Sequence, residues 1–167
     1  MKSTNNLEGC RPLHPLSITA FSLIEIVLAL GIISFALVGI MGLFPVAMKS
    51  ALESQRETRA ALIAQQIYSD LASMSGTNRF ITTGTGPDDR TSISLTALAT
   101  NTVYYSDSGT PLGTSSHPDA LFLANVAVTP NSPLAGLSHI QTTIEAPAQA
   151  TSTNRSKYTF VTLMNQM

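Results

Sequence analysis

The sequence has little of three things that often indicate a protein's function: cysteine, tryptophan and charge. Of its 167 residues only Cys10 is a cysteine, and tryptophan is absent, so no disulfide can form within one chain. Charged residues make up 11% and the formal net charge is −1, whereas about a quarter charged residues is usual in globular domains. Because the chain has no basic excess, we do not expect it to bind nucleic acid directly.

Patterns of catalytic and metal-binding residues are missing as well. The sequence contains no glycine-rich phosphate-binding loop, no nucleophile elbow and no helix motif of paired histidines with a glutamate. The three histidines are scattered and lack the spacing of a zinc site. Acidic turns with Asp88, Asp89 and Asp107 have no EF-hand pattern, and we interpret them as solvated turn residues rather than as calcium ligands. We therefore expect a protein that is not an enzyme, with no cofactor and no metal.

One long apolar run is present, at residues 21–44. From Ile26 to Phe44 its only polar side chain is Ser34. A helix of this length spans about 36 Å at about 1.5 Å per residue, which is enough for a bilayer core of about 30 Å. The apolar region of a cleaved secretory signal is shorter, about 7–15 residues, and ends at a small-residue cleavage site that is not found here. The run predicts a transmembrane helix that is retained.

Residues 45–75 continue the helical pattern after Pro45, which is expected to kink the helix because it removes one backbone hydrogen bond. Ser75 and Gly76 have the composition of a helix C-cap. The apolar positions of this amphipathic continuation fall on one helical stripe: Leu52, Ala60, Ile63, Ile67, Leu71 and Met74.

Residues 76–167 are predicted to form a β-rich domain. Short runs rich in β-branched and aromatic residues are separated by clusters of Gly, Pro, Asn and Ser, as in strands joined by turns. The stretch "VYYSDSGTPL" predicts a hairpin with Gly109 at positive φ. The predicted strands are 92–98, 102–105, 120–129, 137–145 and 157–163. An antiparallel sheet of four or five strands packed on the helical stripe gives an α+β fold.

The residues "AFSLIEIVLALGII" at the start of the apolar run resemble the N-terminal segment of type IV prepilins and type II secretion pseudopilins. That segment has a small residue at the cut, then Phe, then Thr or Ser-Leu-Ile-Glu, then a long apolar helix. Ala20 stands where glycine is commoner, and the leader of 20 residues is longer than the shortest ones. The C-terminal stretches "IEAPAQA" and "YTFVTLM" are similar to a prepilin-like family called Verru_Chthon cassette protein B.

The resemblance implies a pilin-like fold and a set of site residues. A prepilin peptidase would remove residues 1–20 by cutting between Ala20 and Phe21, and would then N-methylate Phe21. Glu25 would act in assembly with other pilin or pseudopilin subunits, through the N-terminal helix. The protein would be a single-pass protein of the bacterial inner membrane, with its C-terminal domain outside the cytoplasm, in a pilus or pseudopilus. The apolar run is closest to the minor-pilin and minor-pseudopilin branch, and the absence of a C-terminal cysteine pair mildly disfavours a major pilin of the disulfide-loop type. A minor subunit is therefore expected, and a major subunit is the competing role.

Glu25 also has a physical interpretation. An ionised carboxylate at the centre of a membrane helix costs about 2.5–3.5 kcal/mol on insertion scales, but Glu25 lies only about 6 Å from Phe21 along a helix. When helices bundle, the freed α-amine of a neighbouring Phe21 would neutralise Glu25 and favour one axial offset between subunits. An alternative interpretation is a single-pass membrane protein whose β-domain binds a ligand or a wall polymer, with an uncleaved N-terminus.

Overall fold

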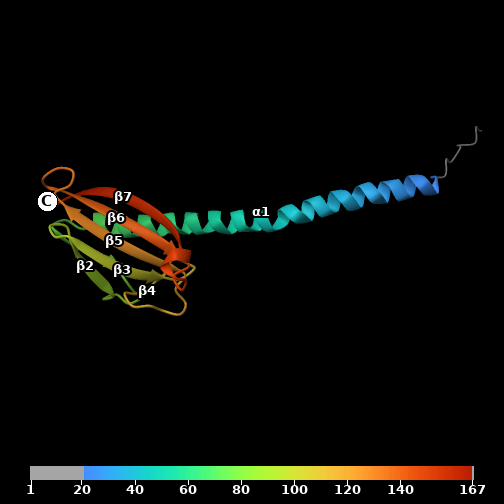
Figure 1. Ribbon diagram of the computed structural model, residues 1–167. Coiled ribbons are helices and arrows are strands. Elements are labelled where there is room, and N and C mark those ends of the chain that lie inside the picture. Colours follow the sequence, from blue (N-terminus) through green and yellow to red (C-terminus); the bar gives the residue numbers. More distant parts are fainter. Residues whose placement is uncertain (1–20, 167) are drawn as a thin grey trace, which may run out of the picture. The chain divides into compact units, whose positions relative to one another are not determined.

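The computed structural model describes residues 21–166, which form one long helix followed by strands (Figure 1). The chain divides into two compact units, Met1–Val46 and Ala47–Met167. The α+β class expected from the sequence is confirmed. The elements in chain order are α1 (Leu23–Ala72), β1 (Asn78–Thr82), β2 (Arg90–Ser94), β3 (Ala99–Tyr105), β4 (Pro111–Gly113), β5 (Phe122–Pro130), β6 (Leu137–Ala146), the short 3₁₀ helix η1 (Ser152–Asn154) and β7 (Ser156–Asn165).

The first unit contributes the apolar part of α1. The helix begins where the carbonyl oxygen of Ser22 accepts hydrogen bonds from the N–H groups of Glu25 and Ile26. Ser34, the one polar side chain of the run, donates its hydroxyl to the carbonyl of Leu30 at 2.7 Å, so its polar group is satisfied within the helix. Pro45 lies inside α1, which has helical backbone on both sides of it.

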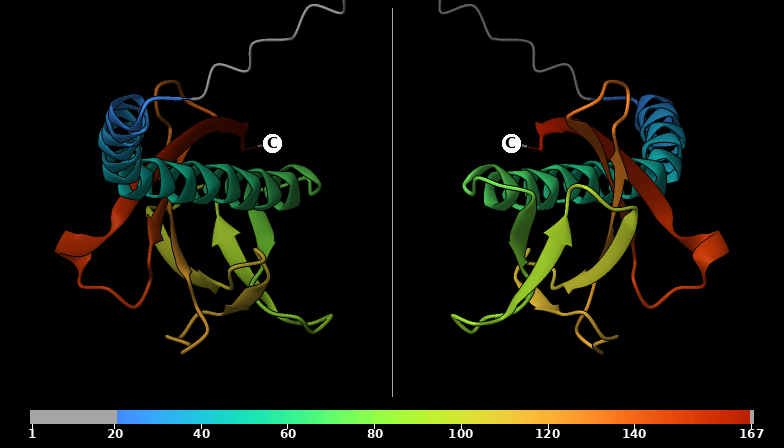
Figure 2. Two further views of the ribbon diagram at one scale, coloured as in Figure 1. Left: turned by 90° about the vertical axis from the view of Figure 1, so that its right-hand side faces the viewer. Right: turned by 90° about the vertical axis from the view of Figure 1, so that its left-hand side faces the viewer.

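In the second unit, one face of α1 packs on a sheet (Figure 2). The buried helix residues follow the predicted stripe from Ala60 onward. Leu52 was expected on the same buried stripe but is 51% exposed, and Met74 lies beyond the end of the helix at Ala72. The buried residues of α1 are Ala60, Ile63, Ala64, Ile67 and Leu71.

The sheet that covers this helix face has five antiparallel strands in the order β4-β3-β5-β6-β7. Every second residue of a strand faces the core, as the pattern "HIQTTIEA" predicts for β6. Ile140, Thr142 and Ile144 of this strand are buried. From the neighbouring strands, Val103, Tyr105, Phe122, Ala124, Val126 and Val128 join the same core.

The β1–β2 hairpin, a separate two-stranded sheet, differs from the prediction. The sequence indicated turns before residue 92 and a strand over 92–98. In the structure β1 and β2 pair antiparallel, with Arg79 opposite Ile93, and Ile81, Ile93 and Leu95 are completely buried. The sequence does not reveal these strands because each has only five residues. Alternation of apolar and polar residues over so short a stretch is a weak indication of a strand.

Arg79 joins the end of α1 to both sheets. Its guanidinium donates to the carbonyls of Leu71 at 2.8 Å, Gly76 at 3.1 Å and Asn165 at 2.8 Å. A cation at the C-terminus of a helix interacts favourably with the helix dipole and satisfies a free carbonyl. Together with the positive φ of Gly76, +102°, this contact explains why α1 ends at Ala72, a few residues before the expected C-cap.

The β3–β4 turn contains Gly109 at φ +82°, as "VYYSDSGTPL" predicted. Its Cα lies so close to the helix that an added Cβ would stand 3.7 Å from the side chain of Ile63. β4 itself was not predicted, because three residues that include a proline and a glycine do not show a strand pattern.

A partly buried ion-pair cluster connects β6 to β7. The Glu145 carboxylate receives Arg155 Nη1 at 2.9 Å and Lys157 Nζ at 3.1 Å. Burial raises the pKa of the Glu145 carboxyl, but the hydrogen bonds and charges of Arg155 and Lys157 together outweigh burial, so the pKa lies below its usual value. A carboxyl whose pKa falls on folding contributes stability above its unfolded pKa and loses that contribution as pH falls through its folded pKa.

We therefore expect Glu145→Gln to be less stable than wild type at pH 7 by about 1–3 kcal/mol, because glutamine offers the two cations one neutral acceptor oxygen in place of two charged ones. As pH falls below the unfolded pKa of about 4.3, the wild-type carboxyl becomes protonated and the difference should shrink. Urea unfolding of the full-length protein in detergent at a series of pH values measures this. A difference that stays constant down to the acid limit of folding would contradict the assignment.

Candidate functional site

The most unusual surface of the described chain is the apolar part of α1. Every large apolar side chain from Leu23 to Val46 is at least 49% exposed. Contiguous exposed apolar surface of this kind is rare in monomeric soluble proteins and indicates contact with lipid or with another protein. By length and composition, α1 is also the one helix of residues 21–166 that could cross a membrane.

The predicted site residues lie at the N-terminal end of this surface. Ala20 is outside the described residues, so the geometry of the cleavage site is not part of the structure. Phe21 is 76% exposed and lies two residues before the helix, and Glu25 is in its first turn, also exposed. A carboxylate in the first turn interacts favourably with the free N–H groups and the helix dipole. The four-residue spacing of Phe21 and Glu25 corresponds to about one helical turn.

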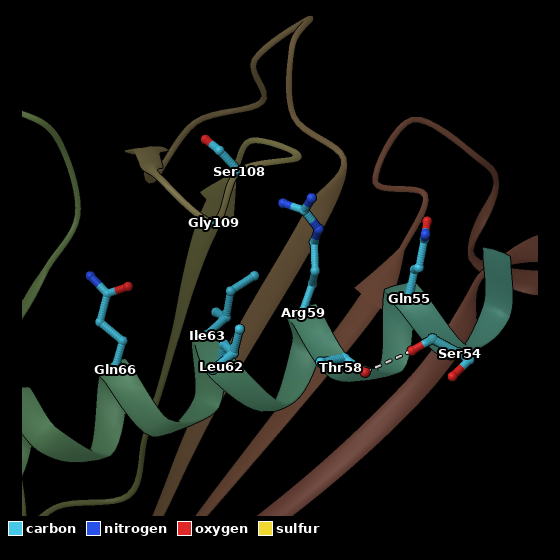
Figure 3. A pocket seen from close by; sticks show the side chains of 9 residues that line it. All are labelled: Ser54, Gln55, Thr58, Arg59, Leu62, Ile63, Gln66, Ser108 and Gly109. Carbon is cyan, nitrogen blue, oxygen red and sulfur yellow. Dashed lines mark hydrogen bonds between the residues drawn. The ribbon is translucent and has the colours of Figure 1, made fainter. Parts of the chain in front are cut away.

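A groove in the second unit, absent from the predictions, lies between α1 and the β3–β4 turn (Figure 3). It has a volume of about 490 Å³, and Arg59 spans it by donating from Nη1 to the carbonyl oxygen of Asp107. Thr58 turns its hydroxyl to the carbonyl of Ser54 at 2.9 Å. The groove is lined by Ser54, Gln55, Thr58, Arg59, Leu62, Ile63, Gln66, Ser108 and Gly109.

The groove offers chemical groups that can hold a polar ligand. Hydroxyl, amide and guanidinium groups can donate to or accept from a polar ligand, and the lining contains no histidine, cysteine or carboxylate side chain. Sequence reasoning missed the groove because its two walls lie about fifty positions apart in the chain, as the 48-residue separation of Arg59 and Asp107 shows.

The acidic turns also have structural partners. The Asp89 carboxylate accepts from the N–H of Gly86 at 2.8 Å, which closes the loop between β1 and β2. Asp107 contributes its backbone carbonyl to Arg59. Within residues 21–166, no three His, Cys, Asp or Glu side chains are grouped so that they could hold a metal ion.

The buried tyrosines act in packing. Tyr105 is 1% exposed, and burial together with the negative charge of Asp70 raises its pKa above the usual range. Burial also raises the pKa of Tyr68, whose hydroxyl has no hydrogen-bond partner within the described residues. Both phenols therefore stay protonated at neutral pH.

A search of protein-family models, curated proteins and solved structures finds no match to this chain.

Proposed function

We propose that this protein is a prepilin-like subunit: it is cleaved and N-methylated by a prepilin peptidase and serves as a minor pilin or pseudopilin in a type IV pilus or a type II secretion filament. The observation that carries the proposal is the stretch Ala-Phe-Ser-Leu-Ile-Glu, residues 20–25, directly before and into a helix whose large apolar side chains from Leu23 to Val46 are all exposed. The α+β domain that follows supports it, because the same resemblance implies a helix packed on an antiparallel sheet.

The chain is the substrate in the processing reaction. Hydrolysis of the peptide bond between Ala20 and Phe21 would release the leader and leave Phe21 with a free α-amine. Ala20 has a small side chain, which fits a protease site that must also hold the apolar helix. Methylation of the amine retains its positive charge, so the modified N-terminus can still pair with a carboxylate.

Glu25 is then the partner of that amine in a neighbouring subunit. The carboxylate lies at the polar end of an exposed apolar surface, where contact with other subunits would remove water from it. A buried charge without a partner is strongly destabilising, whereas a paired one is tolerated. The pair thus favours one axial register between subunits. Gly31, Gly39 and Gly42 would allow a neighbouring helix to approach closely, and no other part of the described chain covers them.

A second candidate function is that of a single-pass membrane protein whose β-domain binds a ligand or a wall polymer. The groove beside Arg59 favours it, because its lining mixes polar groups with Leu62 and Ile63. This function needs the apolar helix as an anchor but does not need a cut after Ala20.

The two candidates are separated by expressing the full-length chain in membranes with and without an active prepilin peptidase. A prepilin is expected to become shorter only when the enzyme is present, and Ala20→Phe, which places a bulky side chain at the cut, is expected to stay full length in both. Equal length in both membranes would favour the anchored binding protein. The fraction cleaved is read by electrophoresis of the membrane fraction.

A further inference from the structure

Strand β7 forms an open edge of the five-stranded sheet. Among residues 21–166 its one neighbour in the sheet is β6, and the two pair over ten residues with no shift of register. The opposite edge is very different: β4 has three residues and its pairing with β3 contains an irregularity. A short, irregular edge is protected against pairing with another strand, whereas a long regular one is a template for it.

The backbone groups that face the open edge can be identified. In the β6–β7 ladder, Leu137 lies opposite Asn165, so Gly136 and Gln166 form the next pair. The N–H of Gln166 donates to the carbonyl of Gly136, which identifies this pair as one that exchanges hydrogen bonds. In an antiparallel pair, residues that exchange hydrogen bonds alternate with residues that point away. Even-numbered residues of β7 therefore bond to β6, and odd-numbered residues present N–H and C=O to the open edge. The bond from Arg79 to the carbonyl of Asn165 agrees with this assignment.

Four residues remain with both backbone groups directed outward. Neither their N–H nor their C=O groups make a hydrogen bond across the open edge to any residue of the described chain. All four are exposed; Val161 is 55% and Leu163 50% exposed. On the core side of the same strand, Tyr158 and Phe160 are only partly buried. The four outward residues are Lys157, Thr159, Val161 and Leu163.

The charges of the edge do not oppose pairing with a like strand. Lys157 is the single charged residue of β7, and its ammonium group lies 3.1 Å from the carboxylate of Glu145, which also pairs with Arg155. The strand also contains no proline and no bulge, which are the other common means of protecting an edge. In an antiparallel pairing centred on Phe160, the two Lys157 side chains would lie at opposite ends of the contact, so no like charges would stand directly opposite each other.

We infer that β7 pairs antiparallel with β7 of a second copy of this chain, on a two-fold axis at Phe160. The four outward residues are arranged symmetrically about Phe160, so Lys157 would face Leu163 of the second copy and Thr159 would face Val161. This register satisfies every outward N–H and C=O of both strands and leaves out Asn165, whose carbonyl is bound to Arg79. Phe160 of each copy would meet the other across the axis, where partly exposed aromatic surface becomes covered.

This inference does not depend on the proposed filament function. It needs two copies of the chain in one membrane or one detergent micelle, and it would hold equally for an uncleaved, anchored protein. Failure of prepilin processing therefore leaves it intact, and failure of β7 pairing leaves the processing proposal intact.

Disulfide trapping of the full-length protein tests the register. In a Cys10→Ser background, Thr159→Cys and Val161→Cys are made separately and then mixed before mild oxidation. In the mixture, the cysteines introduced at positions 159 and 161 of the two copies would stand opposite each other, with their Cα atoms about 5.5 Å apart, which is within the range of a disulfide. In each variant alone, the Cα atoms of the two introduced cysteines would lie about 8 Å apart, beyond the limit of about 7 Å for a disulfide. We expect the mixture to form a crosslinked dimer and each variant alone to form much less. Gln141→Cys, exposed on β6 and away from the edge, is the matched control.

Val161→Pro tests the same interface without a thiol. The Val161 N–H points to the open edge, so proline there leaves the β6–β7 hydrogen bonds in place and is tolerated on an edge strand. The dimer would lose two hydrogen bonds, and we expect its dissociation constant to rise about tenfold or more. Light scattering in detergent measures the oligomeric state, and tyrosine circular dichroism verifies that the variant is folded. A monomeric wild-type protein, a dimer unaffected by Val161→Pro in a folded variant, or equal crosslinking of Gln141→Cys would overturn the inference.

Discussion

Replacement of Glu25 by Gln is expected to leave the protein processed and in the membrane but to lower its entry into filaments about tenfold or more. Glutamine has nearly the shape of glutamate without its charge, so helix formation and insertion should persist. The positive N-terminus of the neighbouring subunit would lose its partner in an environment that excludes water. Breaking one side of a buried ion pair costs about 3–5 kcal/mol, and about 1.4 kcal/mol already corresponds to a factor of ten.

The amount of protein in sheared or purified filaments, relative to the amount in the membrane, measures this effect. Glu25→Asp is the matched control, because it keeps the charge and shortens the side chain by one methylene, and it should retain more filament entry than Glu25→Gln. Wild-type entry of Glu25→Gln would show that Glu25 only marks the edge of a membrane span.

The second large effect concerns the interface between α1 and the sheet. Leu71→Ala is expected to lower the free energy of unfolding of the C-terminal domain by about 2–5 kcal/mol, because Leu71 is completely buried and its removal leaves a cavity. Leu62→Ala makes the same chemical change on the same helix, but Leu62 is 60% exposed. Its effect should stay within about 0.5 kcal/mol.

Urea unfolding of full-length protein in detergent, followed by the near-ultraviolet circular dichroism of tyrosine, measures both variants. All four tyrosines lie between residues 68 and 158, so the signal reports on the β-domain and the helix face it covers. Similar losses for Leu71→Ala and Leu62→Ala would contradict the observed packing of α1.

The parts of the fold that the sequence predicts are those with a long or regular pattern. The stripe from Ala60 to Leu71 repeats over three turns, and in β6 buried residues alternate with less buried ones from Leu137 to Ile144. Gly109 was identified because a tight hairpin needs a positive φ that glycine adopts at little cost. In each case local chemistry and tertiary packing favour the same structure.

The parts that the sequence does not predict depend on contacts between distant residues. β1 and β2 are short, and they are fixed by the burial of Ile81 and Ile93 rather than by local preference. Arg79 is 7% exposed, and its guanidinium donates to three carbonyls, none of which the sequence analysis identified as its partner. No pattern in residues 71–79 indicates that Asn165 would supply one of those carbonyls.

The same distinction applies to the functional surfaces. Phe21, Glu25 and the apolar helix follow from a contiguous stretch of sequence, and their roles in cleavage and assembly stay predictions. The groove beside Arg59 and the open edge of β7 depend on strand order and on the packing of turns, which a single sequence does not reveal. The direction of each backbone group along β7 becomes known only when its register with β6 is known.

The mass of the mature N-terminus, measured by mass spectrometry of the protein purified from native membranes, tests most directly whether this chain is a processed subunit. The account predicts a chain that begins at Phe21 and carries one methyl group on its α-amine. An intact chain beginning at Met1, or one cut beyond the apolar run, would contradict the account, because Glu25 would then have no freed amine of a neighbouring copy to pair with.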